Sequence, residues 1–471
     1  MIKESKRVCL WQQGRARFCR NFKSAAEHDE WKQRIINSRM LLPASAVVGN
    51  SASLNAPFLW SVDTLSSHLS YRSVPRGRGA ANSPAASMLD VTWPISSNAL
   101  VQSSLSSLSG WGAVRFAKYY SAVDALTADV AYRHTDGLAK GITLVTAAHN
   151  HSEKMMRTMP GRDFSLRCYV TAAGSASLEV RTDALQNNDA GEEELVNVCH
   201  TTMVAVDAGT HRPKKGSVPP LSIDAEEREA QEERSKLAEM HKQIRLRRAA
   251  DSMQLRSKQS KPPQQDEMMH LHRLFGKVTQ LHESPVRLQL PDTISRHTHS
   301  NSFVVMPEQR NVQGTLFGGI VVAEAFELAY YAAKYFVRGR PFAPIAMDEA
   351  IFLQPIAPGD MVNMKASVVH SEASVFRVRV VVHLVDPMDP ERWPSRTNSA
   401  SFVFAAPHDF SASVVPETYP QMLMHVHASR QAAEQPPCPN MLETLHEYLH
   451  KNEEKKKVLI TDPGNHDGVT T

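Results

Sequence analysis

The residues with the clearest chemical potential lie in the stretch 306–333. There a polar turn containing Asn311 leads into Phe317, the pair Gly318-Gly319 and a long run without glycine or proline. Apolar residues recur in this run at helical spacing, which predicts a helix that is buried on most of its faces. Glycines at the start of such a helix leave its first backbone N–H groups open to close approach, where they can bind an anion or polarise a carbonyl group. The same pattern also fits a tight turn before a core helix.

The elements that must position this stretch follow it directly. After a Gly/Pro stop near Arg338-Gly339-Arg340-Pro341, the chain has four strand-like segments, with a Pro/Gly turn at 354–360 between the first two. These segments are 343–353, 361–370, 374–384 and 397–405. One buried helix followed by four strands predicts an α+β domain, in which an antiparallel sheet wraps around a central helix.

A weaker copy of the pattern lies upstream. Gly112 stands 202 residues before Gly314, and Pro160 stands 198 residues before Pro358, in each case ahead of a strand. A nearly constant offset at two landmarks indicates an internal duplication. The first copy is predicted to contain a helix at 117–130 and strands at 89–95, 141–148, 163–172, 176–185 and 195–206.

The second copy resembles the hotdog-fold acyl-CoA thioesterases over about 296–406. The resemblance rests on Asn311, Gly314, Gly318-Gly319, the buried helix, a strand ending in Phe352-Leu353-Gln354-Pro355, and Pro358-Gly359-Asp360. The whole layout from about residue 87 to 430 resembles the double-hotdog family of the mitochondrial acyl-CoA thioesterase 9 type. It implies two tandem hotdog domains that hydrolyse acyl-CoA to free fatty acid and CoA. It implies no cofactor and no metal ligand.

The resemblance also implies a composite site. In the family, one copy supplies an Asn and the first Gly of the pair, and the facing copy supplies an acid fifteen positions after its own Asn position. In this chain these are Asn311, Gly318 and Asp124. Asp124 is expected to act as base or nucleophile, Asn311 to orient the water, and the Gly318 N–H to polarise the carbonyl. Gly319, Phe317 and Arg377 are expected to contact the substrate.

The other half of the duplication has lost these residue types. Ser109 and Phe116 stand where Asn311 and Gly318 stand in the second copy, Phe326 occupies the acid position, and Glu327 is one position late. We therefore expect one working site and one silent one. Asp124 can alternatively be a helix acid paired with Lys118 or Arg115. Its apolar neighbours Val123 and Leu126 favour a partly buried site, where an unpaired carboxylate is costly.

Composition narrows the function classes. A length of 471 residues suggests about three domains, and a net charge of +4 gives no argument for a nucleic-acid partner. The five cysteines are scattered without a CxxC pair, which indicates a reducing compartment and no structural zinc. No apolar run approaches the length of a transmembrane helix. The open edge of a hotdog sheet predicts further association, and the chain is expected to form a trimer of double hotdogs.

The predicted organisation has five parts. Residues 1–85 are expected to be a transit peptide followed by a disordered Ser/Pro/Gly-rich region, 86–212 the N-terminal hotdog domain, 213–280 a linker with a solvated, charged helix, 281–408 the C-terminal hotdog domain, and 409–471 a partly disordered extension. Residues 1–23 contain seven basic residues and one acidic residue, which predicts import into the mitochondrial matrix. A disordered basic tail is the alternative interpretation.

Other constellations are weaker. His149-Asn150-His151 resembles a metal pair, because strand alternation puts both imidazoles on one face. No third ligand is evident, so a solvated or core role is favoured. No GxSxG elbow and no phosphate-binding loop is present in the sequence. A catalytically silent CoA-binding or scaffolding hotdog remains the alternative function. A hotdog hydratase is a third option, against which the absence of an Asp/His hydratase motif counts.

Overall fold

The structure is a computed structural model, and it describes a defined part of the chain. The described residues are 70–72, 82–105, 114–135, 142–153, 158–207, 210, 212–222, 228–254, 263–283, 292–311, 314–388, 395–437 and 439–461. The chain divides into Met1–Ser67 and His68–Thr471, and every described residue belongs to the second unit. The predictions for residues 1–23, Ser109 and Gly112 lie outside the described residues.

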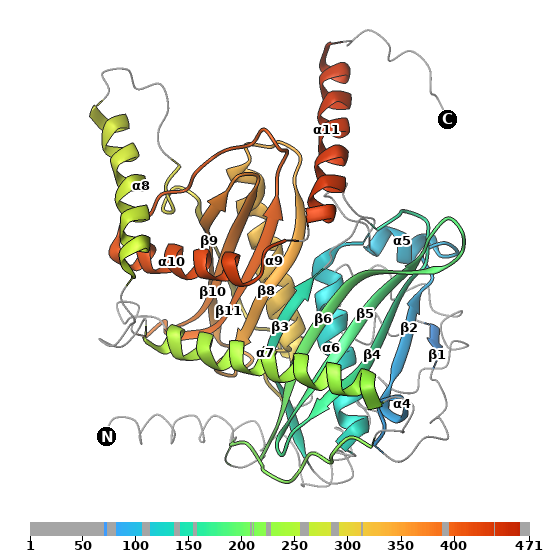
Figure 1. Ribbon diagram of the computed structural model, residues 1–471. Helices are drawn as coiled ribbons and strands as arrows, with labels where there is room; N and C mark the ends of the chain where they lie inside the picture. Colours follow the sequence, from blue (N-terminus) through green and yellow to red (C-terminus); the bar gives the residue numbers. More distant parts are fainter. Residues whose placement is uncertain are drawn as a thin grey trace, which may run out of the picture. The chain divides into compact units, whose positions relative to one another are not determined.

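An 11-stranded sheet forms the frame of this unit, in the order β1-β2-β4-β5-β6-β3-β8-β11-β10-β9-β7 (Figure 1). The strands of the first half are β1 (Ser70–Arg72), β2 (Leu89–Trp93), β3 (Thr143–Glu153), β4 (Phe164–Ala173), β5 (Ser177–Asn187) and β6 (Glu193–Val206). Those of the second half are β7 (Thr298–Val304), β8 (Ala343–Phe352), β9 (Met361–Glu372), β10 (Val375–Val385) and β11 (Ser395–Ala405). The predicted strands are confirmed within a few residues at their ends, and β1 and β7 were not predicted.

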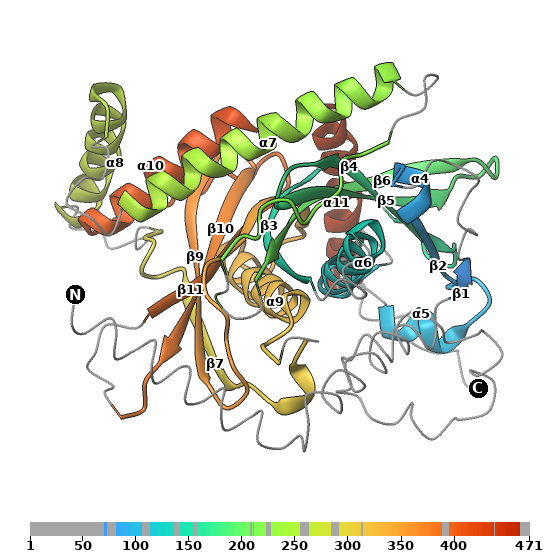
Figure 2. The ribbon, with the colours of Figure 1, turned by 90° about the horizontal axis from the view of Figure 1, so that it is seen from below.

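Two long helices provide the centres of the two halves. They are α6 (Phe116–Thr135) and α9 (Gly318–Phe336). The short helices α4 (Pro84–Ser87) and α5 (Ala99–Leu105) precede α6, and the single turn η4 (Pro307–Gln309) precedes α9. Each is followed by four antiparallel strands, so the described region is a pair of hotdog units, as predicted. Figure 2 shows α6 and α9 side by side on the same face of the sheet.

The two hotdogs join through β3 and β8, which pair antiparallel. Ala148 lies opposite Ile351, and His149 lies opposite Ala350. Ala350 and Ile351 lie 202 positions after Ala148 and His149, which is the offset between the two copies. The seam therefore pairs corresponding residues of the two copies and repeats the internal symmetry of the sequence. A continuous sheet across the seam also removes one open edge from each hotdog.

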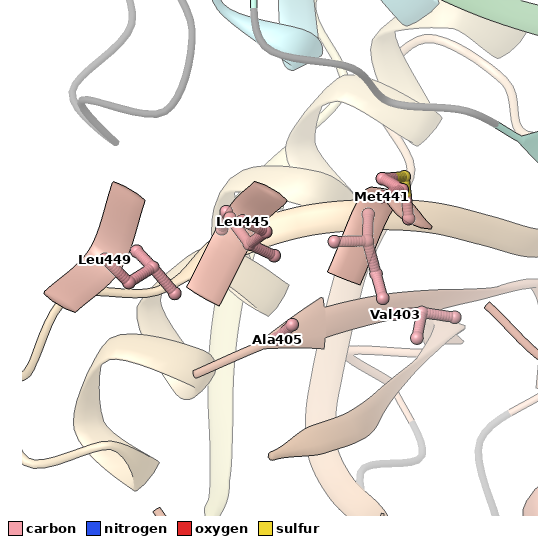
Figure 3. Close-up of a cluster of buried hydrophobic side chains, with 7 residues drawn as sticks. Val403, Ala405, Met441, Leu445 and Leu449 are labelled. Atoms are coloured by element: carbon pink, nitrogen blue, oxygen red, sulfur yellow. The ribbon is translucent and has the colours of Figure 1, made fainter. Parts of the chain in front are cut away.

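Side-chain alternation gives the second hotdog a core on each face of the sheet. On β11, Phe402 and Phe404 face α9, where their ring centroids lie 5.4 and 6.2 Å from that of Phe326. Val403 and Ala405 face the other way, against the C-terminal helix α11 (Pro439–Thr461), whose Met441, Leu445 and Leu449 complete a buried cluster (Figure 3). This helix lies in the part of the chain that was predicted to be a partly disordered extension, 409–471.

Further helices lie on the face of the sheet opposite α6 and α9. These are α7 (Arg228–Gln254) and α10 (Tyr419–Glu434), with α8 (Gln265–Glu283) beyond them (Figure 2). The prediction that the linker helix is solvated is wrong for one face of α7: Gln231, Ala238 and His241 are buried. None of the described helices is both long and apolar enough to cross a membrane.

The close approach of α6 and α9 depends on Gly319. A Cβ atom built on this glycine would lie 3.0 Å from the Cα of Ser121 on α6 and 2.5 Å from Cε1 of Phe317. The phenyl ring can shift, but the backbone of a packed helix cannot do so cheaply. Glycine at this position therefore sets the distance between the two central helices.

We predict that Gly319→Ala lowers the free energy of unfolding by about 1–3 kcal/mol, because overpacking forces the two helices apart. Gly276→Ala on α8 is the matched control, since a Cβ atom there meets nothing within 4 Å. It should be neutral or stabilising by up to about 1 kcal/mol, through helix propensity alone. Urea unfolding of both variants measures the difference, and equal effects would contradict the close-approach argument.

Candidate active site

Asp124 of α6 meets the first turn of α9 from the other hotdog. Its Oδ2 accepts a hydrogen bond of 2.7 Å from the backbone N–H of Gly319, although the two residues are 195 positions apart. The side chain of Asp124 is buried. The fold thus brings an acid and a glycine-rich helix start together across the seam.

This contact is electrostatically favourable. The first N–H groups of a helix have no acceptor within the helix, and the helix dipole adds a partial positive charge there. A carboxylate at that end gains about 0.3–1 kcal/mol at an exposed site and up to about 2 kcal/mol when it is partly buried. Asp124 therefore has a partner that compensates part of its burial.

The other oxygen of the carboxylate is held from the sheet. Thr146 of β3 donates its hydroxyl to Asp124 Oδ1 at 2.8 Å. Nε2 of His149, also on β3, lies 3.5 Å from the same oxygen, and its Nδ1 lies 2.8 Å from Oγ1 of Thr201. Both oxygens of Asp124 thus have fixed positions, which is what a group that must attack or deprotonate in one direction needs.

His149 is completely buried, and its pKa reflects two opposed influences. Burial alone lowers the pKa of an imidazole, but the neighbouring Asp124 carboxylate, with a smaller contribution from Cys199, raises the pKa of His149 to about 9. His149 and Asp124 therefore form a charged pair at neutral pH. This is the core role that the sequence favoured for His149. The side chain of His151 lies outside the described residues.

Gly318 and Phe317 shape the space around the carboxylate. A Cβ atom on Gly318 would lie 3.0 Å from Asp124 Oδ2 and 3.2 Å from Cε1 of Phe352. Phe317 is the N-cap residue of α9, and its ring packs against Gly319. The N–H that holds Asp124 belongs to Gly319 rather than to Gly318. The Gly318 N–H sits at the first helical position, where the helix itself supplies no acceptor.

Asn311 lies in the turn before α9. Its Nδ2 lies 3.0 Å from Oγ1 of Thr315, and its Oδ1 accepts from the Thr315 N–H at 3.2 Å. Its backbone N–H reaches the Thr315 carbonyl at 2.7 Å. These bonds fix the shape of the loop that leads to Gly318. They connect Asn311 to its own turn and not to Asp124.

The corresponding positions of the other half are filled by aromatic rings. Phe116 and Phe326 stand 202 residues from Gly318 and Asp124 respectively, and their ring centroids are 6.0 Å apart. Tyr120 closes the cluster, 5.9 Å from Phe326. Where one half of the seam has a carboxylate against a helix N-terminus, the other therefore has an apolar contact.

Charged residues lie close to this apolar half. Nε of Arg115 is 2.7 Å from Oε1 of Glu327, and both side chains are about one-third exposed. Burial lowers the pKa of Lys118 to about 8, assisted by Arg115 and opposed by Glu327. Arg115 thus pairs with Glu327, whereas Asp124 is held by Gly319 and Thr146. The alternative in which Arg115 is the partner of Asp124 is not what the structure shows.

Arg377 occupies a structural position. Its Nε lies 3.1 Å from Oδ2 of Asp348, both side chains are buried, and its terminal nitrogen donates to the Gln435 carbonyl at 3.3 Å. These contacts use the guanidinium inside the protein, on the face that α10 and α11 cover. Its predicted contact with substrate stays a prediction without support from this geometry.

Sequence reasoning missed Thr146 and His149 as neighbours of Asp124. Both lie on β3, 22 and 25 residues after Asp124, and no spacing rule connects them with it. Strand alternation shows which side chains of β3 face the helix only when the register of β3 in the sheet is known. A polar residue on the buried face of a predicted central strand was the available signal.

Comparison with known proteins agrees with the fold. Residues 313–391 match the family model described as the thioesterase superfamily. The chain is 27% identical over 331 residues to a protein of Humulus lupulus named mitochondrial acyl-coenzyme A thioesterase 4, with 65% of this chain and 58% of that one covered. It is 22% identical over 325 residues to the human protein named mitochondrial acyl-coenzyme A thioesterase 9, covering 67% and 71% of the two chains. The resemblance to this group of proteins is confirmed.

The first of these relatives is matched over only 58% of its own length. Among solved structures, a 12:0-ACP thioesterase from Umbellularia californica matches 68% of this chain and 94% of its own, with a TM-score of 0.40 and 11% identity. An acyl-CoA hydrolase from Staphylococcus aureus matches 36% of this chain and 97% of its own, with a TM-score of 0.28 and 20% identity.

We predict that the His149–Asp124 pair makes stability depend on pH. The pKa of His149 is about 9 in the folded protein and about 6.5 in an unfolded chain. The contribution of the pair is therefore complete below about pH 6.5 and is lost as the pH rises through about 9. The difference in unfolding free energy between the wild type and His149→Gln should shrink by about 3 kcal/mol over this window, at about 1.4 kcal/mol per pKa unit.

Urea unfolding at several pH values measures this difference. Subtracting the curve of His149→Gln removes the titration of all other groups, provided that they are unchanged. A pH-independent difference would mean that His149 is neutral in the folded protein and that the pair carries no charge.

Proposed function

We propose that this chain, whose relatives are acyl-CoA thioesterases, hydrolyses acyl-CoA to a free fatty acid and CoA at the seam between its two hotdogs. One observation carries the proposal: a buried carboxylate from one hotdog lies 2.7 Å from a backbone N–H at the glycine-rich helix start of the other. A thioester hydrolase needs a base or nucleophile and a group that stabilises an oxyanion. Asp124 and the start of α9 supply both types in one place.

As a base, Asp124 takes a proton from a water molecule whose oxygen attacks the thioester carbonyl carbon. The carbonyl oxygen becomes an oxyanion, which the Gly318 N–H and the positive end of α9 stabilise. When this intermediate collapses the C–S bond breaks, and the sulfur of CoA leaves with the proton that Asp124 held. Asn311 shapes the loop that presents Gly318 and orients the water.

As a nucleophile, Asp124 attacks the carbonyl carbon itself. The sulfur of CoA then leaves as a thiolate that takes a proton from solvent, and water cleaves the resulting mixed anhydride to the fatty acid and the original carboxylate. Thr146 and the Gly319 N–H stabilise the carboxylate in either route. The two routes use the same residues.

The aromatic half of the seam is the silent half in this proposal. Phe116 and Phe326 offer neither a charge nor a hydrogen-bond donor in their side chains. Glu327 is ion-paired with Arg115. We infer one catalytic site per chain, with the first hotdog contributing the acid and the second the helix start.

Release of free thiol from a panel of acyl-CoAs of different chain lengths tests the activity directly. Turnover above the rate of a blank without protein supports a hydrolase. Binding of CoA without turnover of any member of the panel would instead identify a silent CoA-binding hotdog.

Three substitutions test which residues act. Asp124→Asn should reduce turnover by several orders of magnitude, because it removes the base or nucleophile. Asn311→Ala should cost on the order of 10²-fold, as expected for loss of one positioning group. Glu327→Gln is the matched acid-to-amide control on the facing helix, and it should leave the chemical step unchanged.

Two other outcomes would contradict parts of the proposal. An inactive Glu327→Gln with an active Asp124→Asn would move the site to the other half of the seam. Equal, partial losses would indicate two working sites. Circular dichroism and urea unfolding of each variant separate a chemical effect from a loss of structure.

The proposed setting of the enzyme is the mitochondrial matrix, and its proposed assembly is a trimer of double hotdogs. The relatives named mitochondrial and the seven basic residues of 1–23 support import. Exposed apolar side chains on and beside β7 and α9 support association; they are Val304, Met306, Tyr331, Tyr335 and Met361. We also keep the five predicted parts of the chain as our proposed domain boundaries.

Deletion of residues 1–23 should abolish mitochondrial import of a fluorescent fusion if these residues are the targeting signal. Unchanged localisation would contradict that assignment. Light scattering of the purified protein measures the assembly, and a monomer would rule out the trimer.

A further inference from the structure

A second cluster of ionisable side chains lies on the opposite face of the sheet from Asp124. It consists of Glu179 on β5, His200 on β6 and His241 on α7, and all three side chains are buried. None of them takes part in the proposed hydrolysis. Their positions in three different elements mean that the fold, and not local sequence, brings them together.

The three side chains converge on one small volume. Nδ1 of His200 lies 3.3 Å from Oε1 of Glu179, and Nδ1 of His241 lies 3.0 Å from Oε2. One ligand atom from each of the three residues can be chosen so that all lie within 4.8 Å of one another. The centroids of the two imidazole rings are 4.5 Å apart, and the ring planes are tilted by 57° to each other. Both histidines therefore present the same nitrogen to the same carboxylate.

The carboxylate is oriented from behind by two further side chains. Thr171 donates its hydroxyl to Oε1 at 3.1 Å, and Asn150 donates its Nδ2 to Oε2 at 3.3 Å. Each oxygen of the Glu179 carboxylate is thus held by a donor other than the two histidines.

We propose that Glu179, His200 and His241 bind a divalent transition-metal cation of the Zn²⁺ class, which fastens α7 to the sheet of the first hotdog. Two imidazole nitrogens and a carboxylate are a ligand set that Zn²⁺ uses in proteins. In a tetrahedral site with bonds of about 2.0–2.1 Å, neighbouring ligand atoms are about 3.3 Å apart. The two histidine nitrogens lie 3.3 and 3.0 Å from different oxygens of the carboxylate, and one ligand atom from each residue lies within 4.8 Å of the others, so the side chains need to move closer together to hold the ion.

The same separations suit direct N–H···O hydrogen bonds. Without a cation, a proton on each Nδ1 makes these hydrogen bonds to the carboxylate. A bound cation replaces both protons. Two features favour the metal. A divalent cation would compensate the charge of the buried Glu179 carboxylate directly, and an uncompensated charge is costly beneath a helix. The partners Thr171 and Asn150 also hold the carboxylate in the manner of the outer hydrogen bonds that orient metal ligands.

Three protein ligands leave a fourth tetrahedral position for water. A small cavity lies beside the cluster and is lined by Asn150 and His241, together with Ala148, His149, Ile244, Glu349, Ile351 and Gln435. Polar groups in this lining can hold a water molecule. Other described contacts of α7 are the hydrogen bond of 2.6 Å from Gln231 to the Thr171 carbonyl, the position of Arg234 over the ring of Tyr169 at 5.6 Å, and the buried Ala238. A metal clip would add to the attachment of this helix.

Metal binding to the full-length, tag-free protein tests the proposal. The protein is treated with a chelator, freed of chelator by gel filtration and titrated with Co²⁺, whose visible absorption reports a tetrahedral site, and then with Zn²⁺ by competition. His241→Ala removes one ligand. His272→Ala is the matched control, because His272 is an exposed histidine on α8.

We expect the wild type and His272→Ala to bind one equivalent with tetrahedral Co²⁺ bands, and Zn²⁺ to raise the melting temperature of both. His241→Ala should bind at least about 100-fold more weakly, since loss of an outer hydrogen-bond partner alone costs about 10–100-fold. A wild type that takes up no tetrahedral Co²⁺ would overturn the proposal and leave a hydrogen-bonded cluster. So would equal affinity in His241→Ala. If His241→Ala does not fold, Glu179→Gln provides the same comparison, and the wild-type titration decides by itself.

Discussion

The contact between Asp124 and the first turn of α9 is the interaction on which the rest of this structure depends. It places a buried carboxylate of one hotdog against the N–H of Gly319 in the other at 2.7 Å. A buried charge without such a partner would cost several kcal/mol, so the two hotdogs must meet in this geometry for Asp124 to be tolerated. Gly319 permits the approach of the helices, and Thr146 and His149 fix the second oxygen. The proposed chemistry uses the arrangement that results, a fixed carboxylate beside a helix N-terminus.

The duplication explains why this contact occurs once in the chain. The β3–β8 seam is symmetric in its backbone, since its register pairs exchange under the offset that relates the two copies. The side chains have diverged. Phe116 and Phe326 replace the glycine and the acid of the other half with an apolar contact, which stabilises the interface without the cost of burying a charge. One half of the seam thus contributes packing, and the other carries the polar groups.

The sequence predicted the elements of the fold well, because its signals are local. Helical spacing in 318–336, alternation in the strands and Pro/Gly turns each depend on neighbouring residues. The pairing of Asp124 with the Gly318-Gly319 turn required the internal duplication and the resemblance to the thioesterases, which together supplied a register that periodicity does not contain. Thr146 and His149 were missed because their relation to Asp124 depends on how β3 passes the helix. Glu179, His200 and His241 were missed for a similar reason: they are 21 to 62 residues apart, and α7 was interpreted from its charge as solvated.

The central claim is that the reacting thioester sits between Asp124 and the start of α9, and a crystal structure with a non-hydrolysable acyl-CoA analogue tests it most directly. The analogue keeps the carbonyl group and replaces the sulfur by a methylene. We predict that its carbonyl oxygen lies within hydrogen-bond distance of the Gly318 N–H. Its carbonyl carbon should lie within about 3–3.5 Å of an Asp124 oxygen or of a water molecule that Asp124 holds. An analogue bound beside Phe116 and Glu327, or one whose carbonyl lies away from α9, would contradict it.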